Sequence, residues 1–185
     1  MNEINTYQLF TLGHSNQKWQ DFLQILLHYK IEVLIDIRSI PKSRFECFDG
    51  QKIREALIDQ PIEYHWAGKQ LGGMRKPSQN SIHSALENPH MKAFADYMDS
   101  DLFKKSINQL VSMAKQQTLA IMCAERDPKY CHRRLISDYL NLQGVEVIHI
   151  LDINNSFTHQ ISPQVRRESQ TLIYDRFESG FLFNH

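Results

Sequence analysis

The sequence predicts an α/β domain in which a mainly parallel central sheet lies between two layers of helices. A chain of 185 residues has the usual length of one domain. Its 42% hydrophobic and 23% charged residues are typical of a globular protein. Short apolar runs alternate with amphipathic helical segments, which is the pattern of βαβ units. We therefore expect a single three-layer α/β/α domain over residues 1–185, with its core at about residues 8–151.

The first βαβ unit is predicted at the start of the chain. Residues 8–13 (QLFTLG) form a short, mostly apolar run that predicts a strand. Ser15 or Asn16 is expected to cap the next helix, because their side-chain oxygens accept hydrogen bonds from unpaired helix amides. Residues 32–38 (EVLIDIR) predict the second strand. Since a helix joins the two strands, they should run parallel.

The middle of the chain carries weaker signals. Residues 51–59 predict a short helix, residues 62–68 a strand, and residues 91–116 one or two helices. Residues 68–90 are rich in Gly, Ser, Asn and Pro, which predicts a long loop. We expect this loop to be the most mobile part of the core and to cover the site, because closing loops commonly exclude water from reaction sites.

Two further strands are predicted in the second half of the chain. Residues 118–123 (TLAIMC) form the most apolar run, and residues 145–151 (VEVIHIL) form another. Between them, Asp127 and Pro128 signal a helix start, with Asp127 as the N-cap. Residues 152–185 show no clear element, so we expect an irregular C-terminal segment.

Charge balance and cysteine content restrict the class of protein. Lys plus Arg (21) equals Asp plus Glu (21), so no overall basic excess argues for nucleic acid or an anionic membrane, although a local basic patch stays open. No apolar stretch approaches the roughly 18 residues that cross a bilayer, and the opening MNEINTYQLF does not resemble a signal peptide. Cys47, Cys123 and Cys131 cannot all pair within the chain, which favours a reducing, cytoplasmic environment.

The segment most suggestive of chemistry is MCAERDPKYCHRRLI, residues 122–136. The predicted strand brings Cys123 to the sheet edge, where helix amides and nearby arginines would stabilise a low-pKa thiolate nucleophile. Glu125 or His132 is a candidate acid or base, and Arg133 a candidate ligand for an anion. Arg126 and Cys131 are further candidates for binding the ligand.

Four of these residues also have a purely structural interpretation. Cys123 and Cys131 could be small apolar residues that pack in the core, as free cysteines often do. His132 and Arg133 could be solvated residues of a first helical turn. An arginine there is electrostatically unfavourable, however, and therefore needs some other reason to be present.

Two other predicted strand ends meet the same edge of the sheet. His14 and Ser15 follow the first strand, and His14 titrates near neutrality. Asp36 and Arg38 lie two residues apart in the second strand, hence on one face, where they bind a polar ligand or pair with each other. For His14 the alternative is an ordinary turn histidine.

Basic residues in the loops suggest phosphate binding. Arg44 lies in the loop SIPKSRF, which carries no acid before Glu46. Gly72 and Gly73, beside Lys69, would let the backbone wrap an anion, although the GGMRK spacing matches no phosphate loop. A solvated charged loop is the alternative interpretation.

Four motifs together resemble a known family: TLGHSN at 11–16, LIDIRSIPKSR at 34–44, LGG at 71–73 and MCAERDPKYCHRRLI at 122–136. The resemblance is to the bacterial and archaeal domain-of-unknown-function family 488, and it spans roughly residues 8–151. It implies a compact α/β domain but no reaction. The positions that match the family pattern are His14, Ser15, Asp36, Arg38, Gly72, Gly73, Cys123, Glu125, Pro128, Cys131, His132 and Arg133.

The first functional hypothesis is an enzyme that acts on an anionic substrate carrying phosphate, with a nucleotide or nucleic-acid base as candidates. Its predicted catalytic residues are Cys123, Glu125, His132, His14 and Asp36. Its predicted binding residues are Ser15, Arg38, Arg44, Gly72, Gly73, Arg126, Cys131 and Arg133. We expect His14, Asp36, Arg38, Cys123, Glu125, His132 and Arg133 to line one pocket.

Two other classes of protein stay open. Cys123, Cys131, His132 and His14 offer plausible metal ligands. Neighbours on a helix point about 100° apart, however, and paired CxxC spacing is absent, so we predict neither a metal nor a cofactor. The other class is a non-enzymatic module that binds nucleic acid or a partner through its basic rim. A Cys123–Cys131 redox switch would require the two sulfurs to lie close together.

Overall fold

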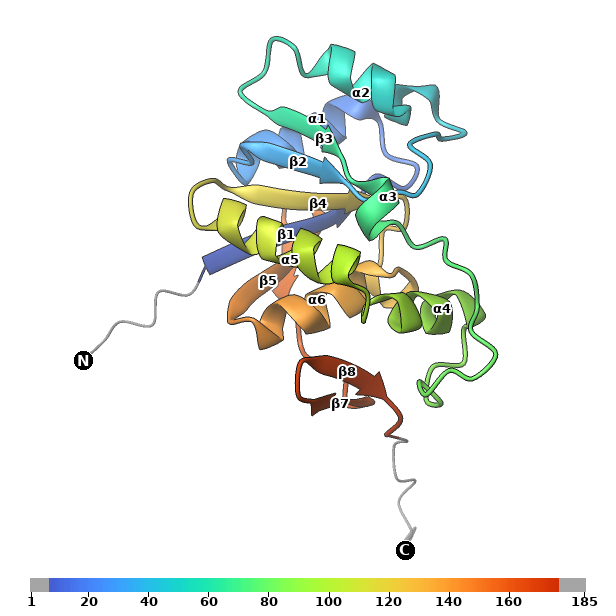
Figure 1. Cartoon of the computed structure of the whole chain (residues 1–185). Helices are drawn as coiled ribbons and strands as arrows, with labels where there is room; N and C mark the ends of the chain where they lie inside the picture. The colour runs from blue at the N-terminus through green and yellow to red at the C-terminus, as the bar shows by residue number, and fades with distance from the viewer. Residues whose placement is uncertain (1–6, 177–185) are drawn as a thin grey trace, which may run out of the picture.

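A six-stranded sheet forms the centre of the computed structural model, which describes residues 7–176 (Figure 1). The strand order is β3-β2-β4-β1-β5-β6. The first five strands in this order are parallel, and β6 runs antiparallel to β5. The bounds are β1 Tyr7–Gly13, β2 Val33–Asp36, β3 Glu63–Trp66, β4 Leu119–Cys123, β5 Val145–Asp152 and β6 Asn155–Thr158. The predicted mainly parallel sheet is confirmed.

Helices cover both faces of this sheet and complete the three predicted layers. On one face, α1 (Trp19–His28) and α2 (Gly50–Ala56) pack side chains such as Phe22 against Leu12 and Leu34. The other face carries α4 (Pro89–Tyr97), α5 (Asp101–Ala114) and α6 (Arg133–Leu142), and Figure 1 shows α5 and α6 in front of the sheet. Shorter turns are α3 (Gly68–Leu71), η1 (Glu46–Phe48) and η2 (Pro128–Tyr130). No helix in residues 7–176 is long and apolar enough to cross a membrane.

The start of α1 differs from the sequence prediction. The residue at the N-cap is Lys18, which makes no side-chain capping bond, and the helix begins at Trp19. Ser15 instead adopts a left-handed backbone with φ of 48°, and its hydroxyl donates to Asn16 Oδ1 at 3.4 Å. The prediction that Ser15 or Asn16 caps the helix is therefore wrong, because the chain first completes a turn at the sheet edge.

The start of α6 is also displaced. Asp127 caps as predicted, accepting a hydrogen bond from the Lys129 amide at 2.8 Å, but the element that it caps is the short turn η2. Cys131 then takes an extended conformation with φ of −125° and ψ of 146°, and α6 begins at Arg133. Cys131 therefore does not lie on a regular helix.

The C-terminal segment was expected to be irregular, and this is wrong for much of its described part. β6 pairs with β5, and β7 (Val165–Glu168) and β8 (Thr171–Tyr174) form an antiparallel hairpin next to α6 (Figure 1). Tyr174 is fully buried, and its hydroxyl donates to Asp138 Oδ2 at 2.9 Å. This buried polar contact, together with the core packing of Val165, Leu172 and Tyr174, attaches the hairpin to the domain. Residues 177–185 lie outside the described residues.

The predicted loop at residues 68–90 begins with α3 and reaches α4 at Pro89, with no regular helix or strand between them. Part of it is packed rather than free. The Ala85 amide donates to the Tyr174 carbonyl at 2.9 Å, and Leu86 is buried in the core. The high mobility of this loop stays a prediction.

Candidate functional site

Three parallel strands end at the same edge of the sheet and frame a cavity of ≈ 500 Å³. Its walls come from the turns that follow β1, β2 and β4, the geometry that places ligand sites in open α/β sheets. We call it the rim pocket. Its lining residues are His14, Ser15, Lys42, Ser43, Arg44, Phe45, Ala124 and Glu125.

The exposed side chains of the rim pocket are mostly cationic. Lys42 and Arg44 are exposed, and Glu125 is the acidic residue of the lining. Lys42 pairs with Asp49 at 2.9 Å and thereby lowers the pKa of that carboxyl, but such a surface pair is weak and easily exchanged. The Arg44 guanidinium lies 4.9 Å from the centre of the Phe45 ring. The pocket therefore combines cations, hydroxyls and an aromatic face.

The turn after β1 is held in a strained shape beside the pocket. The left-handed backbone of Ser15 is uncommon for a residue with a side chain. Its amide donates to the Ala124 carbonyl at 2.8 Å, and the His14 amide donates to the Cys123 carbonyl at 3.0 Å. Gly13 permits this approach, since a Cβ there would lie 1.8 Å from the Glu125 carbonyl oxygen. The two turns are thus locked together where Ser15 and Glu125 enter the pocket.

Asp36 lies beneath the pocket as a buried anchor rather than within reach of a ligand. It is fully buried and accepts hydrogen bonds from Arg38 Nε at 2.9 Å and from the Tyr64 hydroxyl at 2.7 Å. Burial alone would lower the pKa of Arg38, but its bonds to Asp36 outweigh burial and raise it. Burial raises the pKa of Tyr64, and the Asp36 charge adds to the effect. Asp36 and Arg38 therefore pair with each other, which is the alternative that the sequence analysis gave to ligand binding.

His14 forms part of the pocket wall, but both of its ring nitrogens are engaged. Nδ1 donates to the Ser15 carbonyl at 2.9 Å, and Nε2 accepts from Arg38 at 3.3 Å. The ring stacks on Phe48 at 4.4 Å between centroids. Burial lowers the pKa of His14 to about 4, so the ring is neutral at pH 7. In this arrangement His14 supports Arg38 and the turn, and it has no free nitrogen for proton transfer.

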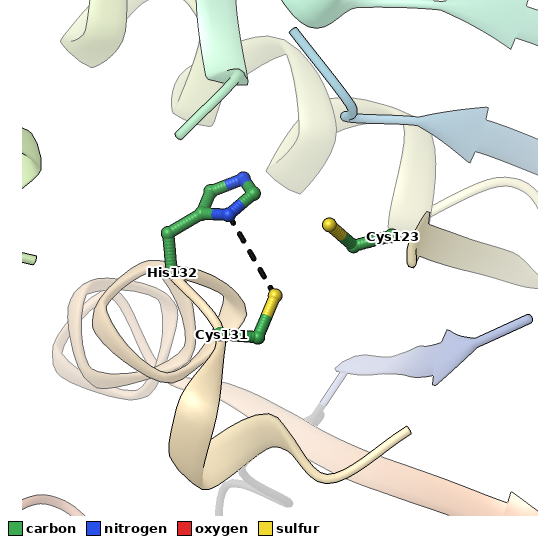
Figure 2. Close-up of side chains that lie close together, drawn as sticks. All are labelled: Cys123, Cys131 and His132. Carbon is green, nitrogen blue, oxygen red and sulfur yellow. Dashed lines mark hydrogen bonds between the residues drawn. The ribbon is translucent and has the colours of Figure 1, made fainter. Parts of the chain in front are cut away.

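A second group of chemically active side chains lies in the interior beside the end of β4. One ligand atom each from Cys123, Cys131 and His132 lies within 4.8 Å of the other two, and all three residues are buried. Cys131 Sγ is 3.6 Å from His132 Nδ1. Figure 2 shows the two sulfurs and the imidazole ring facing a common space. We call these three residues the sulfur cluster.

Arg133 is fully buried against this cluster and is not available to an external anion. Its Nε donates to Cys131 Sγ at 3.4 Å and its Nη1 to Thr11 Oγ1 at 3.1 Å. Its Nη2 donates to the carbonyls of Glu125 and Arg126. No carboxylate pairs with Arg133 in the described part of the chain. The predicted role of Arg133 as an anion ligand is therefore replaced by a structural one.

The pKa values of the two thiols in the sulfur cluster are shifted in opposite directions. Burial alone would raise the pKa of Cys131, but the hydrogen bond from Cys123 and the nearby His132 and Arg133 lower it well below its ordinary value. The hydrogen bond to Cys131 raises the pKa of Cys123 well above its ordinary value, and burial adds to this. The predicted low-pKa thiol at Cys123 is thus wrong. Cys131, which accepts from the buried Arg133 guanidinium, is the better thiolate.

Three other predicted binding residues have packing or pairing roles. A Cβ on Gly73 would lie 2.7 Å from His132 Nδ1, so this glycine lets the loop close on the imidazole. A Cβ on Gly72 would lie 2.4 Å from Ser39 Oγ. Arg126 is exposed and pairs with Asp152 at 3.0 Å. None of these three residues lines the rim pocket. No residue of the loop at 68–90 lines it either, so this loop does not cover the rim pocket.

A buried polar chain that the sequence analysis missed leads away from the sulfur cluster. Thr11 Oγ1 lies 2.7 Å from His149 Nδ1, and His149 Nε2 lies 2.9 Å from His159 Nδ1. His159 Nε2 lies 2.9 Å from Asp138 Oδ1. With Arg133 donating to Thr11, the chain connects a buried cation to a buried carboxylate. The signal that was available is His149 itself, a single histidine between apolar residues of a strand.

The predicted residues therefore separate into two groups instead of lining one pocket. His14, Ser15, Arg44 and Glu125 line the rim pocket, with Asp36 and Arg38 beneath it. Cys123, Cys131, His132 and Arg133 form the interior group. Sequence analysis did not select Ser43 and Phe45 as pocket residues: Ser43 lies within the motif at 34–44 but carries no charge, and Phe45 lies just outside that motif.

A larger cavity of ≈ 550 Å³ lies at the opposite end of the sheet, beside residues that precede β2, β3 and β4. It contains none of the predicted site residues. Parallel sheets present their ligand sites at the carboxyl ends of the strands, so the rim pocket is the stronger candidate site.

The fold and the rim pocket together define a three-layer α/β domain with a cationic pocket at the carboxyl edge of its sheet. The chain belongs to the family described as Domain of unknown function DUF488, whose model matches residues 18–140. The matched region contains Asp36, Arg38 and the whole sulfur cluster, whereas His14 and Ser15 precede it. No curated protein and no solved structure matches the chain.

Proposed function

We propose that the protein is an enzyme that binds a phosphate-bearing substrate in the rim pocket, with a nucleotide as the favoured class. The observation that carries this proposal is the lining of the pocket. Lys42 and Arg44 line it from one loop, and Glu125 lines it from another. A site with two cations and one acid suits an anion on which a proton must also be moved.

The binding half of the proposal rests on Lys42, Arg44 and Phe45. An arginine can hold a phosphate through two parallel hydrogen bonds, and a lysine adds a point charge. The Phe45 ring is half-buried in the same lining, where a nucleobase could stack on it. Ser15 and Ser43 offer hydroxyls to the phosphate or the sugar.

The chemical half rests on Glu125, which is exposed but stands on a fixed backbone. Arg133 donates to its carbonyl, and Gly13 packs against the same atom. A carboxylate on a rigid turn is suited to act as a general acid or base, because catalysis depends on precise placement. His14 and Arg38 would support this turn from beneath.

A binding module for single-stranded nucleic acid, without chemistry, is the second candidate. It would use the same cations and the same aromatic ring, and base stacking on aromatic side chains is tolerant of sequence. The two candidates differ in the role of Glu125. An enzyme would use this carboxylate in the reaction, whereas in a binding module it would only repel the nucleic-acid backbone.

Binding is tested by calorimetry with inorganic phosphate, nucleoside monophosphates and triphosphates, and short single-stranded oligonucleotides. We expect Lys42→Ala/Arg44→Ala to weaken nucleotide binding at least about tenfold, because two charge-assisted contacts are lost. The matched control is Lys52→Ala/Arg54→Ala, which removes the same charge from α2 and alters the opposite cavity. Equal loss in both double variants, or none in the first, would refute the assigned pocket.

The chemical role is tested with Glu125→Gln. Mass spectrometry of the incubated ligand panel identifies the nucleotide that the protein converts. We expect Glu125→Gln to keep the affinity for this nucleotide and to lower the rate at least about 100-fold, the usual contribution of a positioned acid or base. Tight binding of oligonucleotides with no conversion of any ligand would favour the binding module.

A further inference from the structure

We propose that Cys123, Cys131 and His132 form a binding site for one divalent cation of the zinc class. This site is separate from the rim pocket, because none of its three residues lines that cavity. Thiolates and imidazoles are the ligands that zinc prefers, whereas magnesium and calcium prefer oxygen. The arrangement of the sulfur cluster supports the proposal in three respects: its distances, the local backbone and its surroundings.

The distances fit a tetrahedral ion. Zinc binds sulfur at about 2.3 Å and histidine nitrogen at about 2.0–2.1 Å, so two such ligands on one ion lie about 3.6 Å apart. Cys131 Sγ and His132 Nδ1 are 3.6 Å apart. The Cys123 sulfur lies within 4.8 Å of both partners, so a small movement of one side chain closes the set.

The local backbone removes the main objection to adjacent ligands. Two neighbouring residues on an α-helix point about 100° apart and cannot easily bind one ion. Cys131, however, is extended, and His132 occupies the N-cap position of α6. The change of backbone conformation between them turns both side chains toward the end of β4, as Figure 2 shows.

The surroundings are those of a supported ligand set. The exposed fractions are 8% for Cys123, 3% for Cys131 and 8% for His132. His132 Nδ1, the ring nitrogen that faces Cys131 Sγ, makes no other hydrogen bond among the described residues, so it is available to a cation. The Phe94 ring, 4.9 Å from the imidazole, orients it. The Arg133 bond to Cys131 Sγ is the kind of outer contact that stabilises a metal-bound thiolate.

The site would leave one coordination position for water or another small ligand. Three protein ligands with an open fourth position is the pattern of catalytic zinc, whereas structural zinc is usually held by four. Two thiolates would neutralise the charge of the ion, and the buried guanidinium of Arg133 would leave one positive charge beside Cys131.

Metal analysis of the untagged, full-length protein tests the proposal directly. We expect about one zinc ion per chain after purification, because a site of thiolates and imidazole binds zinc tightly. Cys131→Ser and Cys123→Ser should each lower this content at least about tenfold, whereas Cys47→Ser, which changes an exposed cysteine, should leave it unchanged.

Cobalt substitution keeps the test decisive if a serine variant fails to fold. The wild-type protein, stripped with a chelator and titrated with Co²⁺, should show sulfur-to-metal charge-transfer absorption and the intense visible bands of a tetrahedral ion. Bound zinc should also protect Cys123 and Cys131, but not Cys47, from alkylation mapped by mass spectrometry. A folded protein that takes up no metal, or one that carries a Cys123–Cys131 disulfide in its place, would overturn the proposal.

Discussion

Asp36 illustrates how a residue can satisfy every sequence criterion for catalysis and still be structural. It ends a buried strand, and an arginine two residues later shares its face of the sheet, which is compatible with a ligand site or with an ion pair. The structure shows a fully buried carboxylate with Arg38 and Tyr64 as donors. Sequence spacing cannot distinguish these cases, because burial depends on the neighbouring strands.

We predict that Asp36→Asn lowers the free energy of unfolding by about 3–5 kcal/mol, since it leaves Arg38 buried without its counter-charge. Tyr64→Phe removes one neutral donor from the same carboxylate and should cost about 1 kcal/mol. Urea denaturation measures both effects. A stable Asp36→Asn protein that had lost only its catalytic rate would show that Asp36 takes part in the reaction.

Individual elements were predictable where an apolar pattern determines them, and less so where tertiary polar contacts do. Four of the five parallel strands, β1, β2, β4 and β5, follow from β-branched and apolar runs and match their predicted positions closely. The β7–β8 hairpin was missed, because its attachment depends on Tyr174 reaching Asp138, which lies 36 residues earlier. The sequence analysis predicted no metal at Cys123, Cys131 and His132 for a similar reason: it assumed a regular helix where Cys131 is extended.

The hairpin provides a test at this scale. Tyr174→Phe leaves Asp138 Oδ2 without its donor in a buried position, and we expect a loss of about 1–3 kcal/mol in stability. Hydrogen exchange should increase selectively in residues 165–174. Tyr130→Phe, which changes an exposed ring, is the matched control and should alter neither measurement. Unchanged exchange in the hairpin of Tyr174→Phe would mean that apolar packing alone attaches it.

At the scale of the whole molecule, the buried polar chain connects layers that are distant in sequence. It runs from Arg133 in α6 through Thr11 in β1 and His149 in β5 to His159 and Asp138. A neutral His149 accepts from the Thr11 hydroxyl at Nδ1 and donates at Nε2, so both of its ring nitrogens are satisfied. The buried polar chain ends at Asp138, which also accepts from Tyr174 of the hairpin. The sulfur cluster and the C-terminal strands are therefore stabilised by the same set of hydrogen bonds.

This requirement for neutral histidines predicts a loss of stability in mild acid. Burial lowers the pKa of His149 to about 3, with the charge of Arg133 adding to the effect, and burial lowers the pKa of His14 to about 4. In the unfolded chain both histidines take up protons near pH 6.5. Between pH 6.5 and about 4 the unfolded state therefore binds more protons, and the free energy of unfolding falls as the pH falls.

The slope should approach about 1.4 kcal/mol per pH unit for each of His14 and His149 once the pH is well below 6.5. The His149→Asn protein should be less stable at pH 7.5, because the substitution disrupts the polar chain. Its free energy of unfolding should also change less steeply with pH, because the contribution of His149 to the slope is lost. His65→Gln, which changes an exposed histidine, should keep the full dependence. Urea denaturation of the three proteins from pH 7.5 to 4.5 measures these slopes. A wild-type slope near zero, or equal slopes in wild type and His149→Asn, would show that His149 is protonated in the folded protein and that the polar chain carries a different arrangement of hydrogens.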